Sequence, residues 1–99
     1  MEAIRCARFT VTPGKREEAL AQTKDRLIPR MEASDGFISG YWSIDETGQG
    51  VAFTLWESED ARAAFGTHMK EAMEASGAIT GTTIEDLPLV ATARGRKHA

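Results

Sequence analysis

His68 is the side chain in this sequence best suited to proton transfer. It follows Ala64 and Phe65 by about one helical turn, at the edge of the apolar stripe of a predicted helix. An imidazole ordinarily titrates near neutral pH, so a histidine facing a pocket between helix and sheet could act as a general base. The alternative is a partly exposed helix histidine that takes no part in chemistry.

Large aromatic side chains are the second group that could form a site. Trp42 and Trp56 could supply flat walls for an aromatic ligand, with Phe65 beside them and the hydroxyl of Tyr41 orienting the ligand. Small-molecule sites are mostly apolar and contain few polar groups. Each tryptophan could equally belong to the core or to a dimer interface.

Arg5 and Arg8 point to opposite faces of a predicted strand, because side chains alternate along a strand. One that faces a pocket could pair with a carboxylate, enolate or phenolate, and we take Arg5 as the candidate for this role. A salt bridge at the surface or at an interface is the alternative.

The remaining reactive residues indicate no metal, nucleotide or thiol chemistry. Cys6 is the single cysteine and has no histidine near it in sequence, which favours a small buried apolar role. His68 and His98 are the two histidines, too few for a metal cluster. Residues 77–81 lack the Lys-Ser/Thr ending of a phosphate loop. We therefore expect neither a metal nor a cofactor.

Composition limits the class of protein. The 99 residues carry 12 Lys and Arg against 15 Asp and Glu, and a net charge of −3 does not favour binding to a phosphate backbone. We find no apolar run long enough for a signal core or a membrane span, so we expect a cytoplasmic protein that binds neither nucleic acid nor membrane. The length predicts one domain over residues 1–94 and a basic tail over residues 95–99.

The first half of the chain predicts a strand, a helix and a second strand. Residues 3–11 nearly alternate apolar and polar types, and Thr12-Pro13 would cap and open a helix with a kink or an early end at Pro29. Residues 37–45 predict a strand with Phe37 and Tyr41 on one face and Trp42 on the other.

The second half predicts a strand, a helix and a last strand. Residues 51–56 form a hairpin with the preceding strand, and Ser58 is placed to cap the second helix. That helix contains Gly66, where a break is possible, and residues 82–93 form a strand in which Pro88 requires an edge or a bulge.

The resulting β-α-β-β-α-β order predicts an α+β ferredoxin-like fold, an antiparallel sheet with two helices on one face. The other face would be bare although the central strands carry large apolar groups on both sides. We therefore expect a homodimer that packs sheet against sheet.

The sequence resembles the antibiotic biosynthesis monooxygenase family of dimeric α/β barrels through nearly its whole length. The matching segments are residues 11–15, the turn at Asp35-Gly36-Phe37 and residues 55–59 leading into the second helix. The resemblance implies a homodimer with a small pocket between sheet and helices in each copy. In some members this pocket oxidises phenolic or quinol substrates with O2 and no cofactor.

Haem degradation, known from other members, is disfavoured. The asparagine, tryptophan and histidine of those relatives fall at Ala7, Phe65 and about Glu74 of this sequence. Without the imidazole and the amide, iron ligation and contact to bound oxygen are lost.

The resemblance and the residues together predict a cofactor-independent monooxygenase acting on a small aromatic or quinol-like metabolite. His68 would remove a phenolic proton to give an anion that reacts with O2. The alternative is a homodimer of the same fold that only binds a small ligand or is purely structural. An open cavity of roughly 300 Å³ or more that His68 faces would favour the enzyme, and a packed, dry interior would favour the alternative.

Overall fold

The computed structural model describes residues 1–66, 68–93 and 95, and for residues 68 and 69 only the backbone. The elements are β1 (Ala3–Val11), α1 (Arg16–Gln22), a π-helical segment η1 (Thr23–Leu27), α2 (Ile28–Glu32), β2 (Phe37–Ile44), β3 (Gln49–Trp56), α3 (Glu59–Phe65), α4 (His68–Glu74) and β4 (Ile79–Pro88).

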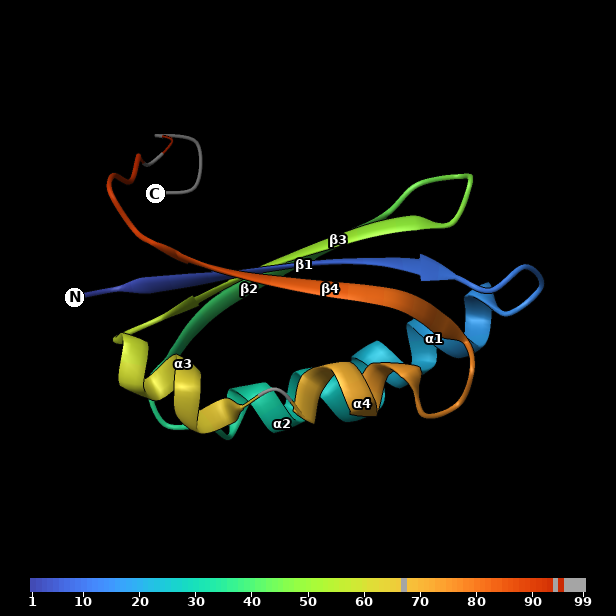
Figure 1. Cartoon of the computed structure of the whole chain (residues 1–99), viewed down its shortest axis with the longest axis horizontal. Helices are drawn as coiled ribbons and strands as arrows, with labels where there is room; N and C mark the ends of the chain where they lie inside the picture. Colours follow the sequence, from blue (N-terminus) through green and yellow to red (C-terminus); the bar gives the residue numbers. More distant parts are fainter. Residues whose placement is uncertain (67, 94, 96–99) are drawn as a thin grey trace.

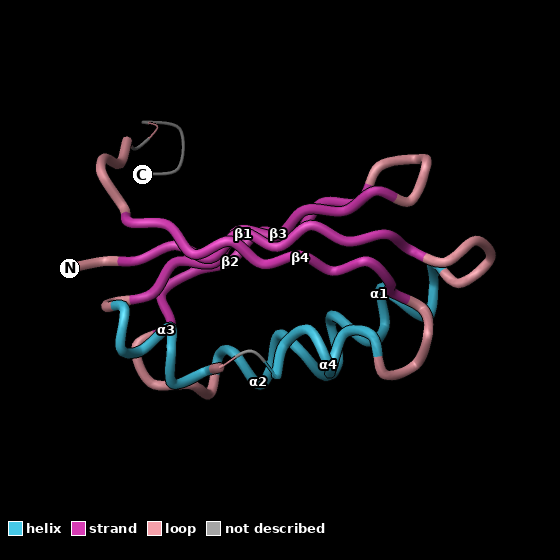
Figure 2. The backbone as a smooth tube through the Cα atoms, viewed as in Figure 1, coloured by secondary structure: helices cyan, strands magenta, loops and turns pink. Residues whose placement is uncertain are grey.

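The four strands form one antiparallel sheet in the order β2-β3-β1-β4, and the helices lie together under one face of it (Figures 1 and 2). The predicted ferredoxin-like order is therefore confirmed. We call the face turned away from the helices the open face. The segment that follows β4 rises on that side of the sheet (Figure 1).

The start of the first helix differs from the prediction, whereas the start of α3 agrees with it. Thr12 is not the cap of α1, because its hydroxyl donates to the Gly77 carbonyl at 2.5 Å and Gly14 turns the chain with φ 81° before α1 begins. The Ser58 Oγ accepts a hydrogen bond from the backbone N–H of Ala61 at 3.0 Å, as expected for an N-cap.

Both helical regions are interrupted near the predicted positions. The π-helical segment η1 comes just before Pro29. Proline has no backbone N–H, so residue 29 cannot donate a hydrogen bond to the carbonyl of Asp25, which lies within η1. The break between α3 and α4 falls at Gly66, whose φ of 80° ends α3.

A β-bulge changes the faces predicted for the start of β2. The register with β3 shifts between Phe37 and Ser39, so Phe37 packs towards the helices while Ile38 lies on the open face with Tyr41. The prediction that Phe37 shares a face with Tyr41 is therefore wrong. β4 also ends at Pro88 and not at residue 93.

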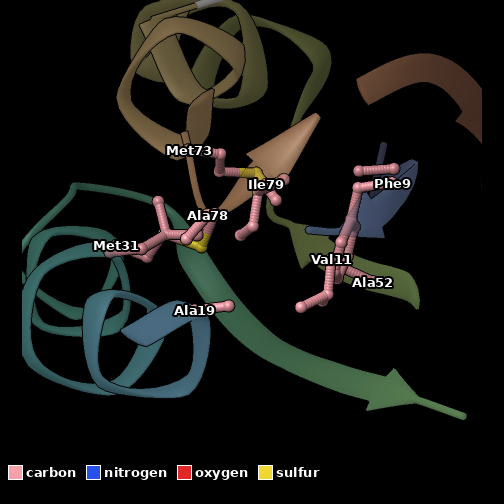
Figure 3. Close-up of a cluster of buried hydrophobic side chains, with 10 residues drawn as sticks. Phe9, Val11, Ala19, Met31, Ala52, Met73, Ala78 and Ile79 are labelled. Atoms are coloured by element: carbon pink, nitrogen blue, oxygen red, sulfur yellow. The ribbon is translucent and has the colours of Figure 1, made fainter. Parts of the chain in front are cut away.

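The core lies between the helix layer and the sheet (Figure 3). Small residues of the sheet let the helices approach closely. Met31 of α2 and Met73 of α4 fill space between the two layers. The buried cluster consists of Ala7, Phe9, Val11, Ala19, Leu27, Met31, Ala52, Met73, Ala78 and Ile79.

Candidate ligand pocket

A pocket of about 310 Å³ lies between the first helical region and the β2 side of the sheet. We call it the Trp42 pocket. Its volume falls at the lower end of the range of about 300 to 1,000 Å³ that is usual for small-molecule sites. Its wall is mostly apolar and aromatic, with cationic side chains on the helix side, and is made of Phe9, Arg16, Leu20, Thr23, Lys24, Ile28, Trp42 and Ile44.

Both aromatic walls of the Trp42 pocket rest on glycines. A Cβ added at Gly40 would lie 2.7 Å from Cη2 and Cζ3 of Trp42, so the indole extends over the backbone of its own strand. In the same way, a Cβ added at Gly50 would collide with the ring of Phe9. These glycines allow the two rings to lie flat against the sheet, which leaves room beneath α1 and η1.

The polar groups of the pocket wall are an indole N–H, two cations and the Thr23 hydroxyl, which donates to the Ala19 carbonyl at 2.9 Å. The Nε1 atom of Trp42 is buried and has no hydrogen-bond partner among the described residues. Arg16 donates from Nη1 to the Asp45 carbonyl at 2.9 Å and from Nη2 to the Ile44 carbonyl at 3.2 Å, which holds its guanidinium across the end of β2. Lys24 enters the wall from η1.

Trp56 and Phe65, two of the predicted site residues, lie at the other end of the helix layer. Trp56 is 0% exposed, and its ring centroid is 5.2 Å from that of Phe65 and 5.2 Å from that of Phe37. Its Nε1 donates to the Thr54 Oγ1 at 2.9 Å. The structure thus places Trp56 and Phe65 together in a packed aromatic cluster, apart from the residues that line the Trp42 pocket.

Arg5 lies beside this cluster and is 3% exposed. Its Nε and Nη2 donate to the carboxylate of Asp86 at 2.8 and 3.1 Å, and its Nη1 donates to the Gly66 carbonyl at 2.7 Å. The hydrogen bonds from Arg5 are the main cause that lowers the pKa of Asp86, and Arg62 adds a second positive charge 3.7 Å away. Arg5 therefore ties β1, β4 and the end of α3 together.

Tyr41 lies on the open face and is 70% exposed. There it borders a larger hollow of about 560 Å³, which also has Ile38 and Phe53 in its wall and Leu89 from the segment after β4. The sheet separates this hollow from the Trp42 pocket. Tyr41 and Trp42 are neighbours in sequence, but they face opposite sides of the sheet.

The side chain of the predicted base, His68, and the second histidine, His98, fall outside what the structure describes. His68 is placed in α4 by its backbone, but its side chain is not described, and His98 lies outside the described ranges altogether.

Among the residues that are described, no group of three potential ligands could hold a metal ion. None of the described helices has the length and hydropathy that crossing a membrane requires.

Sequence reasoning named Trp42 but missed Phe9, Arg16 and Lys24. Gly40 and Gly50 were a usable signal, because a glycine within a strand often marks the close approach of another group. Arg16 and Lys24 gave no such signal, since a basic side chain on a helix is ordinarily solvated.

Comparison with known proteins agrees with the fold. The sequence model of a family described as antibiotic biosynthesis monooxygenase matches residues 3–76. A variant of SnoaB, a cofactor-independent oxygenase from Streptomyces nogalater, is similar to this chain with 20% identity and a TM-score of 0.73, covering 92% of this chain and 95% of that chain.

Two further solved structures are similar at comparable levels. The monooxygenase from the gene ActVA-Orf6 of Streptomyces coelicolor, in complex with the ligand Nanaomycin D, shows 16% identity and a TM-score of 0.72 over 94% of this chain and 91% of that chain. A protein of unknown function from Nitrosomonas europaea shows 20% identity and a TM-score of 0.72, over 95% and 94%. No curated protein matches the sequence.

Proposed function

The chain belongs to the antibiotic biosynthesis monooxygenase family, and from this premise we propose that the Trp42 pocket binds a small aromatic or quinol-like molecule that is oxidised by O2 without a cofactor. The observation that carries the proposal is the pocket itself. It is large enough for a fused aromatic ring system, and two flat rings line it.

The proposed reaction requires no external reductant. Loss of one proton from the substrate gives an anion, which passes one electron to O2 to form superoxide and a substrate radical. These two recombine through a new C–O bond to a peroxide anion, which takes back the proton removed at the start and becomes a hydroperoxide. Loss of water from the hydroperoxide leaves a carbonyl group. One atom of O2 ends in the carbonyl and the other in water, and all four electrons come from the substrate.

Residues of this chain would assist that reaction in three ways. Arg16 and Lys24 place positive charge at the pocket, where it favours the anion over the neutral substrate. His68 stays the predicted base that accepts the proton. Trp42 and Phe9 supply apolar aromatic surfaces against which the substrate packs.

Oxygen consumption tests the proposal. Purified protein is incubated in air with anthrone, naphthohydroquinone and related phenols, beside the variants Trp42→Ala and His68→Ala. We expect turnover in the wild type, a fall in kcat/KM of at least about 10-fold for Trp42→Ala, and loss of turnover for His68→Ala with little change in Tm. Tyr41→Phe, on the other face of the sheet, is the matched control and should retain wild-type turnover.

The outcomes separate the two classes of function. No oxygen uptake with any compound would contradict the oxygenase and favour a protein that only binds a ligand. Turnover that survives in His68→Ala would remove His68 from the mechanism. Equal loss in Trp42→Ala and Tyr41→Phe would contradict the location of the site.

We also propose that a second copy of the chain covers the open face. Large apolar side chains are exposed there, with Phe53 at 46% and Tyr41 at 70%, and Ile38 and Leu87 lie on the same face. The apolar band runs across all four strands, the kind of broad surface from which a stable interface of about 800 Å² per partner is built. A two-fold dimer would pair this band with itself.

A further inference from the structure

The Trp42 pocket has a charge pattern that an apolar ligand alone does not explain. Its polar wall includes two cations, Arg16 and Lys24, and no acidic residue lines it. In the described part of the chain, no carboxylate lies within 4.0 Å of the side-chain nitrogens of either residue. By contrast, Arg5 and Arg62 share the carboxylate of Asp86, and Lys15 pairs with Glu18. The pocket therefore presents positive charge that this part of the protein does not neutralise.

The indole of Trp42 adds an unused hydrogen-bond donor to the same wall. An unpaired buried N–H is unfavourable, and such groups are rare in folded proteins. By contrast, the indole N–H of Trp56 is bonded to Thr54. A ligand with an acceptor oxygen would satisfy the Trp42 donor, so this donor favours a ligand with an oxygen close to its ring.

The rest of the pocket wall favours a ligand whose main part is flat and apolar. Phe9 and Trp42 present ring surfaces from the sheet, while Leu20 and Ile28 cover the space from the helices. An aliphatic chain would gain only apolar burial against the flat rings, whereas a fused aromatic system would also stack on them.

We propose that the Trp42 pocket selects planar aromatic carboxylates, with the carboxylate facing Arg16 and Lys24 and an acceptor oxygen close to the Nε1 of Trp42. This inference rests on the proposed function only for the location of the site. A carboxylate is ionised at neutral pH whereas a phenol is not, so the two cations would discriminate between them before any chemistry takes place.

Equilibrium binding tests this with two probes of equal shape, naphthoate and its neutral isostere naphthamide. Isothermal titration calorimetry on the full-length protein should show naphthoate binding at least about 10-fold more tightly than naphthamide. In Lys24→Gln and in Arg16→Gln that preference should fall by about 3- to 10-fold, while the affinity for naphthamide stays unchanged. Arg16→Lys should retain more of the preference than Arg16→Gln.

Arg26→Gln is the matched control, since it removes the same charge from η1 at a residue that borders a different hollow, beside α4. It should leave the preference for naphthoate intact. Equal binding of the two probes, binding of neither probe, or an equal loss in Arg26→Gln would overturn the inference. The proposed function and this inference can fail separately. Selective binding of naphthoate without oxygen uptake would contradict the oxygenase alone. Oxygen uptake with neutral quinols, without a preference for naphthoate over naphthamide, would contradict this inference alone.

Discussion

The indole of Trp42 lies over Gly40, two residues earlier on the same strand. A Cβ at Gly40 would come within 2.7 Å of the Cη2 and Cζ3 atoms of Trp42 and 3.3 Å from the Cζ atom of Phe37. The ring is therefore confined between the backbone of β2 and Phe37 on one side and the pocket on the other. The shape of the pocket depends on the absence of a side chain at position 40.

Replacing Gly40 with alanine should displace the ring of Trp42 into the pocket. We expect a loss of naphthoate affinity of about 3- to 10-fold and a destabilisation of about 1 to 3 kcal/mol, the usual range for overpacking. Calorimetric titration and denaturant unfolding measure the two effects. Gly95→Ala is the control, because a Cβ there meets no atom of the described residues within 4 Å. Unchanged affinity in Gly40→Ala would show that Trp42 can move aside without consequence for the site.

The two tryptophans should respond in opposite ways to replacement by phenylalanine. Trp42→Phe removes a donor that has no partner among the described residues, so the free protein should lose little stability. The affinity for a hydroxynaphthoate, whose hydroxyl oxygen can accept from the indole, should fall about 5-fold through the loss of one hydrogen bond. Trp56→Phe leaves the Thr54 hydroxyl without its donor in the interior and should cost about 1 to 3 kcal/mol or more. Denaturant unfolding and titration of both variants test the contrast, which a larger stability loss in Trp42→Phe would contradict.

Asp86 should make the stability of the fold depend on pH in the acid range. Hydrogen bonds from Arg5 lower the pKa of Asp86 below its ordinary value of 3.8. Since the folded-state pKa is the lower one, ionised Asp86 stabilises the fold above about pH 4, and this contribution is lost as the pH falls through the folded-state pKa. Asp86→Asn should therefore lower the Tm by several degrees at pH 7, with a smaller difference at about pH 3.

Thermal unfolding at the two pH values checks this prediction. Asp25→Asn is the control, because Asp25 is exposed on η1 and makes no ion pair within the described ranges. A Tm difference for Asp86→Asn that is the same at both pH values would mean that its charge does not contribute.

A charge at the centre of the open face should prevent the proposed self-association. Phe53 pairs with Cys6 on one side and with Tyr41 on the other, so a carboxylate at position 53 would be buried without a partner in the dimer. Size-exclusion chromatography with light scattering should show a dimer for the wild type and a monomer for Phe53→Glu. Ala63→Glu, at an exposed position of α3 in the helix layer, should remain dimeric. A monomeric wild type, or a dimeric Phe53→Glu, would contradict the proposal.

Local patterns in the sequence were enough to predict the order of the elements. The alternation in residues 3–11, the cap at Ser58 and the helix break at Gly66 each depend on neighbours within a few residues. Thr12 was misjudged because its hydroxyl bonds to Gly77, 65 residues away, and no local rule contains that partner. Phe37 was placed on the wrong face because one bulge residue reverses the alternation.

The sequence by itself thus determined the ferredoxin-like order and the strand that carries Trp42, since hydrophobic period and turn chemistry are local properties. Only the tertiary structure decided which side chains meet. Trp42 ends in a pocket and Trp56 in a packed cluster because the strand register places Trp42 opposite Ala52 and Trp56 opposite Ala3 and Phe37. Arg16 and Lys24 come to the Trp42 pocket because α1 and η1 pack over the end of β2, a contact between segments that are distant in sequence.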